Sequence, residues 1–74
     1  ATLIRMTTSR LLMIEDDARL AQMVQAYLAQ SGFEVTHAAD GEAGLAQLPL
    51  VQPELVILDL MMSGIDGLEV CRRI

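Results

Sequence analysis

The sequence predicts an α/β protein in which helices cover a parallel sheet. Two apolar runs of strand length, 11–14 and 55–58, contain no polar residue, which is typical of strands buried on both faces. Three predicted strands alternate with three predicted helices, at the spacing that right-handed crossovers need. The middle strand is amphipathic and belongs at an edge. We therefore expect a doubly wound parallel sheet, truncated to three βα units, with strand order 2-1-3.

The first unit begins with a strand over 10–14, which ends in three acids, Glu15, Asp16 and Asp17. Apolar residues then recur at helical spacing and predict one apolar stripe on a helix. Either Asp16 or Asp17 can cap the start of this helix, and Gly32 can end it in a left-handed turn. The residues of the stripe are Leu20, Met23, Val24, Tyr27 and Leu28.

The second unit is expected to be a half-exposed strand over 34–39 and a short helix over 42–48. Polar and apolar residues alternate in the strand, as they do at the edge of a sheet. Leu45 and Leu48 form the inward pair of the helix, Gly44 weakens it, and Pro49 is expected to stop it.

The third unit contains the apolar strand 55–58 and a helix that begins near Gly67 and is expected to continue at Ile74. Asp66 and Glu69 have the spacing of a capping box, which predicts the start of this helix. Cys71 is expected to be a small core residue on it.

Composition restricts the function further. The 74 residues carry a net charge of −5, with ten acids, five arginines and no lysine, which argues against a nucleic-acid or membrane-binding surface. The single cysteine fits a reducing compartment. Since no apolar run reaches the ~20 residues needed to span a bilayer and no signal peptide is evident, we expect a cytoplasmic protein. Residues 1–9 are expected to be an N-terminal tail, in which 1–5 precede a natural start at Met6, and 10–74 the domain.

The predicted strand order brings the acids together. Strands one and three are neighbours, and their carboxyl ends carry Glu15, Asp16 and Asp17 on one side and Asp59 on the other. The crevice of an open parallel sheet lies at this switch point. Clustered carboxylates repel one another, and an oxygen-only ligand set favours a hard cation, Mg²⁺ before Mn²⁺ or Ca²⁺. Such a site can handle phosphoryl groups, with an Asp as nucleophile. Simple helix capping is the alternative for each acid after the first strand.

These features resemble the receiver domain of two-component response regulators, which are CheY-like and have a flavodoxin-like fold. The likeness covers nearly all of 10–74 and depends on the acidic pair Glu15-Asp16, on Asp59 at a later strand end, and on the loop MMSGIDG over 61–67. The last helix resembles the OmpR/PhoB subgroup of transcriptional regulators. The family fold has five βα units, so this chain corresponds to an N-terminal portion.

The resemblance implies a role for each matching position. Asp59 is the phosphoacceptor, which takes its phosphoryl group from a sensor histidine kinase. Asp16 binds Mg²⁺ directly, Glu15 acts through water, Asp59 contributes an oxygen, and the backbone carbonyl of Met61 completes the protein's share of the metal shell. Asp17 is left for capping. Such a domain is a signalling domain and not an enzyme, and it reaches DNA only through an output domain that is absent here.

Two departures from the family pattern stand out. Ser63 replaces the usual proline, which removes a restraint on the loop. The family's sensing hydroxyl residue and phosphate-binding lysine lie beyond position 74.

Three alternatives remain open. An aspartyl-nucleophile phosphatase needs a second Asp where this chain has Met61, and a toprim-type enzyme needs Asp-x-Asp, which 59–61 does not supply. The third alternative is a non-signalling receiver fragment that forms a homodimer or swapped dimer through the exposed edge of its third strand. His37 could act as a phosphocarrier, but its place on the expected exposed face of an edge strand predicts a bystander.

Overall fold

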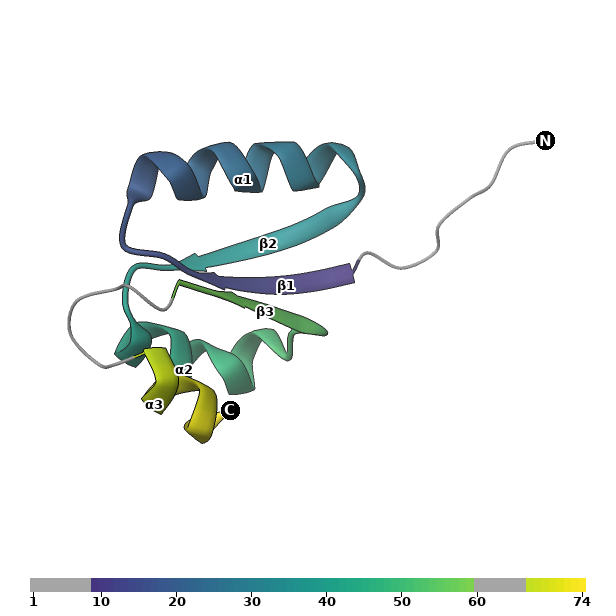
Figure 1. The fold of residues 1–74 in the computed structure, drawn as a ribbon. Coiled ribbons are helices and arrows are strands. Elements are labelled where there is room, and N and C mark those ends of the chain that lie inside the picture. The colour runs from purple at the N-terminus through teal and green to yellow at the C-terminus, as the bar shows by residue number, and fades with distance from the viewer. Residues whose placement is uncertain (1–8, 60–66) are drawn as a thin grey trace.

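The computed structural model describes residues 9–59 and 67–74 (Figure 1). Six elements follow one another in strict βα alternation, as the sequence predicted. They are β1 (Ser9–Ile14), α1 (Ala18–Gln30), β2 (Phe33–Ala38), α2 (Gly41–Val51), β3 (Leu55–Leu58) and α3 (Gly67–Arg73).

The three strands form one parallel sheet in the order β2-β1-β3. Ile14 is the point of alignment, because it pairs with Ala38 on β2 and with Leu58 on β3. Helix α1 lies on one side of the sheet, and α2 and α3 lie on the other (Figure 1). The predicted doubly wound α/β fold and its strand order are confirmed.

The core lies between the sheet and the pair α2 and α3. Leu12, Ile14 and Val70 are fully buried there and Ala38 almost so. Burying aliphatic side chains of this size contributes about 1.5–3 kcal/mol each relative to exposing them. The half-buried residues packed around them are Ala43, Leu45, Leu48, Val56 and Leu58, which confirms the predicted inward pair of α2.

Strand β3 is less buried than its composition predicted. Leu55 is 59% exposed, and Val56, Ile57 and Leu58 are only partly buried. Among the described strands β3 has a single neighbour, β1, so one edge and part of one face are not covered. The expectation that helices cover both faces of β3 was therefore wrong.

Helix α1 has the predicted ends but an incompletely buried stripe. Asp17 caps its start, and Gly32 follows its end with φ 88°, a left-handed conformation that glycine adopts without strain. Ala21 is the residue of α1 that is fully buried. Leu20, Met23 and Tyr27, by contrast, are largely exposed, because α1 packs mainly on the edge strand β2.

Helix α2 continues through Pro49 to Val51, so the predicted stop was wrong. Proline this close to a helix end removes only one backbone hydrogen bond of the last turns. The end is held instead by Gln52, whose N–H donates to the carbonyl oxygen of Leu48 at 2.9 Å. Arg10 Nε also donates to the carbonyl oxygens of Val51 (3.1 Å) and Gln52 (3.4 Å), which places a cation at the negative end of the helix.

Gly44 has a packing role in α2 that the sequence did not indicate. It is buried, and a Cβ at this position would lie 2.6 Å from Ile14 Cγ1. The glycine therefore lets α2 approach the sheet rather than merely weakening the helix.

The expectations for α3 are met only in part. Cys71 is exposed, so its predicted core position was wrong. The Ile74 N–H still donates to the Val70 carbonyl oxygen, whereas the predicted cap Asp66 lies outside the described residues. Within the described residues, no helix is both long and apolar enough to cross a bilayer.

Candidate metal and phosphoryl site

The carboxyl ends of β1 and β3 bring together acids that are more than forty positions apart in the sequence. At this end of the sheet, the acids that directly follow β1 and β3 still form backbone hydrogen bonds to the neighbouring strand. The Glu15 N–H donates to the Ala38 carbonyl oxygen at 3.0 Å, and the Asp59 N–H donates to the Ile14 carbonyl oxygen at 3.2 Å. The backbones of Glu15 and Asp59 are therefore held by the hydrogen bonds of the sheet.

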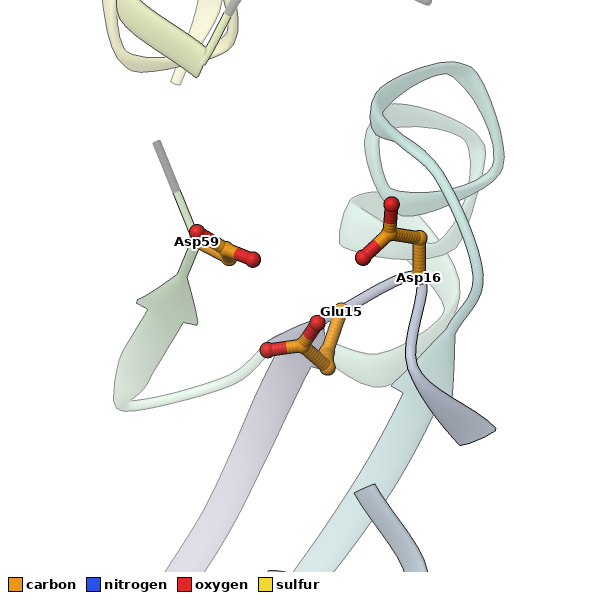
Figure 2. A group of neighbouring side chains, drawn as sticks. All are labelled: Glu15, Asp16 and Asp59. Carbon is orange, nitrogen blue, oxygen red and sulfur yellow. The ribbon is translucent and has the colours of Figure 1, made fainter. Parts of the chain in front are cut away.

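The side chains of Glu15, Asp16 and Asp59 face a common space (Figure 2). Each offers a carboxylate oxygen, and these three atoms all lie within 4.8 Å of one another. Glu15 is only 8% exposed, Asp59 is half-buried and Asp16 is exposed. The structure thus brings together all three of the predicted side-chain ligands.

Asp17 stands apart from the cluster. One of its carboxylate oxygens accepts hydrogen bonds from the N–H groups of Arg19 (3.0 Å) and Leu20 (3.1 Å) at the start of α1. This geometry is that of an N-cap. Among the three acids after β1, Asp17 is therefore the one that caps the helix.

The pKa of Glu15 is raised above its usual 4.5. A hydrogen bond from the Asp17 N–H to Glu15 Oε2, 3.1 Å long, favours the carboxylate and acts to lower this pKa. Burial, a side-chain hydrogen bond with Asp16 and the negative charges of Asp59 and Asp16 act in the opposite direction and outweigh it. The cluster therefore has an excess of negative charge that a cation would relieve.

The ligand set suits a hard divalent cation. It contains carboxylate oxygens from three side chains within the described residues, and Mg²⁺ is bound in proteins by one or two carboxylates together with waters and phosphate oxygens. The exposure of Asp16 leaves one side of the cluster open for such ligands. The expected backbone ligand, Met61, and the departure at Ser63 lie outside the described residues.

His37 has a contact that sequence reasoning missed. Its ring nitrogen Nε2 lies 2.7 Å from the Glu15 carbonyl oxygen, and the residue is half-buried. The predicted exposed position was wrong, because alternation places His37 opposite the core residue Ala38 and hence on the face toward α1. The parallel register, which pairs His37 with Met13 two positions before Glu15, was the signal that could have revealed this contact.

Comparison with known proteins identifies the family. The family described as "Response regulator receiver domain" matches residues 11–74. This chain belongs to that family. The receiver domain is a signalling domain of two-component systems, and the predicted membership is confirmed.

The relatives of this receiver domain include named transcriptional regulators. It is 48% identical to the transcriptional regulatory protein AfsQ1 of Streptomyces coelicolor over 64 residues, which are 86% of this chain and 28% of that protein. It is 41% identical to the DNA-binding response regulator MtrA of Mycolicibacterium paratuberculosis over 63 residues, which are 85% of this chain and 28% of MtrA. Both names agree with the expected OmpR/PhoB subgroup. The chain spans little more than a quarter of these relatives.

Solved structures share the fold of this receiver domain. The N-terminal domain of a response regulator receiver protein from Methanoculleus marisnigri superimposes with a TM-score of 0.86 at 31% identity, over 92% of this chain and 55% of that one. The response regulator TrrA from Thermotoga maritima, solved in complex with Mg²⁺-BeF, gives a TM-score of 0.82 at 34% identity, over 88% of this chain and 56% of TrrA.

Proposed function

We propose that this receiver domain accepts a phosphoryl group on Asp59, in the presence of Mg²⁺, from a phosphohistidine of a sensor histidine kinase. The observation that carries the proposal is the convergence of Glu15, Asp16 and Asp59 at the ends of two adjacent parallel strands, with carboxylate oxygens within 4.8 Å of one another. Family membership supports the same site, and TrrA, which was solved in complex with Mg²⁺-BeF, supports the same cation.

The proposed chemistry is a transfer between nitrogen and oxygen. A carboxylate oxygen of Asp59 attacks the phosphorus atom in line with the P–N bond, a P–O bond forms, and the imidazole of the kinase leaves. Bound Mg²⁺ would neutralise the charge on the transferred group. Asp59 is suited to the nucleophilic role because it is half-buried at the end of a strand, where its backbone is held by β1.

The two acids after β1 are proposed to have different roles. Asp16 is exposed and can reach a cation directly. Glu15 is buried and its Oε2 already accepts a hydrogen bond from the Asp17 N–H, which suits a ligand that acts through water. The Met61 carbonyl is proposed to complete the protein's share of the shell.

The signalling consequence is a change of partner contacts. Phosphorylation alters charge at one end of the sheet, and a two-state domain can respond by shifting its population. The names of AfsQ1 and MtrA support transcription as the output, with DNA bound by another domain of a cytoplasmic regulator.

Intact-mass analysis after incubation with acetyl phosphate and Mg²⁺ tests the proposal. We expect one phosphoryl adduct on the parent chain and none on Asp59→Ala. Glu54→Ala serves as the matched control, because Glu54 is an exposed acid at the other end of β3 and its replacement should leave the adduct intact. If Asp59→Ala takes up as much phosphoryl adduct as the parent chain, Asp59 is not the phosphoacceptor.

A second proposal concerns the edge of β3, which we propose pairs with a second copy of this chain. Among the described strands only β1 lies beside β3, and β3 carries none of the charged residues that commonly block pairing of edge strands. Leu55, at its start, is 59% exposed. Sedimentation should show a dimer that Leu55→Lys weakens, and a stable folded monomer of the parent chain would contradict the pairing.

A further inference from the structure

The Glu15 carbonyl oxygen is held by a side chain from the neighbouring strand. His37 Nε2 lies 2.7 Å from it, and a carbonyl oxygen can only accept a hydrogen bond. The imidazole must therefore carry its proton on Nε2 and donate it. The Glu15 N–H is also bound, to the Ala38 carbonyl oxygen, so both backbone polar groups of Glu15 are tied to β2.

This contact orients the peptide that leads into Asp16. The Glu15 carbonyl and the Asp16 N–H belong to one planar peptide unit, so the hydrogen bond from His37 restrains the orientation of that plane. The next peptide is held as well, because the Asp17 N–H donates to Glu15 Oε2 at 3.1 Å. The two peptide planes on either side of the Asp16 Cα are thus both restrained.

The restraint matters because Asp16 is exposed. Little packing restrains this exposed side chain, so the direction of the Asp16 carboxylate depends on its backbone and on its side-chain hydrogen bond with Glu15. We infer that His37 is a positioning residue for the cation site: its Nε2–H holds the Glu15–Asp16 peptide so that the Asp16 carboxylate faces Asp59. This inference rests on the proposed Mg²⁺ site, and His37 itself is not a ligand.

The role resembles that of outer-shell groups in other metal sites. Side chains that orient ligands without touching the metal commonly change metal affinity by about 10- to 100-fold when they are replaced. The donated hydrogen bond is the essential part, so a glutamine, whose amide can also donate from a similar reach, should substitute for the imidazole.

The test measures the Mg²⁺ affinity of this chain and the tautomer of His37. Amide shifts of Asp16 and Asp59 in a ¹⁵N-labelled sample report Mg²⁺ binding. We expect His37→Leu to weaken binding by about 10- to 100-fold and His37→Gln to restore most of it. Val35→Ala is the matched control, because it shortens a side chain on the same face of β2 without removing a donor, and its affinity should equal that of the parent.

The imidazole gives an independent readout. The chain contains a single histidine, so its ring ¹⁵N signals are unambiguous, and we expect the Nε2–H tautomer in the parent without Mg²⁺. An Nδ1–H tautomer, parental Mg²⁺ affinity in His37→Leu, or a His37→Gln variant no better than His37→Leu would each overturn the inference. If His37→Leu does not fold, the tautomer and the affinities of His37→Gln and Val35→Ala decide. A parent chain that does not bind Mg²⁺ would overturn the proposed function as well, whereas the other contrary results would leave it standing.

Discussion

The Asp59 N–H donates to the Ile14 carbonyl oxygen at 3.2 Å, one step beyond the pairing of Ile14 with Leu58. This hydrogen bond carries the β1–β3 ladder up to the acids and places the Asp59 backbone beside that of Glu15. The strand pairing that builds the sheet is thus also what forces the carboxylates together. The folded chain without a cation consequently contains repulsion that the unfolded chain does not.

Asp59→Asn is expected to stabilise the chain in the absence of Mg²⁺. The charge of Asp59 is one of the causes that raise the pKa of Glu15, and two like charges about 4 Å apart cost about 1 kcal/mol even in a water-like dielectric. Urea unfolding in EDTA should therefore show a gain of about 1 kcal/mol. Glu54→Gln, outside the cluster, should change little, and a loss of stability in Asp59→Asn would contradict the repulsion.

Mg²⁺ is expected to stabilise the parent chain and to do so less in Asp16→Asn. A ligand that binds only the folded state adds about 2.7 kcal/mol when its free concentration is 100 times Kd. Melting temperatures measured with increasing Mg²⁺ should rise for the parent and return to the starting value with EDTA. An equal rise in Asp16→Asn would show that the cation binds elsewhere.

The pH dependence of stability should carry the signature of Glu15. Because its pKa in the folded chain is raised above 4.5, the folded state retains the proton more strongly than the unfolded state. The contribution of Glu15 is fully present below pH 4.5 and is lost as pH rises through the folded pKa. Glu15→Gln removes this titration.

Urea unfolding of the parent and Glu15→Gln without Mg²⁺, at several pH values from 4.5 to about 8, measures that contribution directly. The stability of the parent should fall relative to the variant as pH rises. The difference between the two chains contains the contribution of Glu15 together with its electrostatic coupling to Asp16 and Asp59. A constant difference across the range would refute the raised pKa.

Gly44→Ala is expected to destabilise the fold although alanine favours helix. The new Cβ would collide with Ile14, which is fully buried and cannot move aside freely. Overpacking of this kind costs about 1–3 kcal/mol, against a gain of about 1 kcal/mol in helix propensity. Ala46→Gly, on an exposed position of α2, measures propensity alone. Thermal unfolding of both variants, and of Gly44→Ala combined with Ile14→Val, should show partial rescue in the double variant.

Asp17→Ala should separate capping from chemistry. Loss of the two hydrogen bonds to Arg19 and Leu20 should cost about 0.5–2 kcal/mol, while Asp17→Asn should retain most of the stability because asparagine is also a good N-cap. Both variants should still take a phosphoryl group from acetyl phosphate. A folded Asp17→Ala chain that cannot be phosphorylated would place Asp17 inside the site.

Local pattern was enough to predict the order of elements, the strand order and the convergence of Glu15, Asp16 and Asp59. Buried parallel strands have distinctive composition, and the strand order fixes which carboxyl ends meet. The cap at Asp17 remained open in the sequence, because two adjacent acids have the same capping chemistry and only the direction of each side chain distinguishes them.

The burial of individual side chains and the contacts between distant residues could not be predicted from the sequence pattern. The exposure of Leu55, Tyr27 and Cys71 depends on which surfaces find a neighbour. Helix α2 continues past Pro49 to an end that Arg10, from a distant strand, contacts. The contact between His37 and the Glu15 carbonyl requires the register of two strands and a rotamer. Periodicity thus specifies which face of an element is apolar, whereas packing in three dimensions specifies whether that face is covered and which distant groups meet.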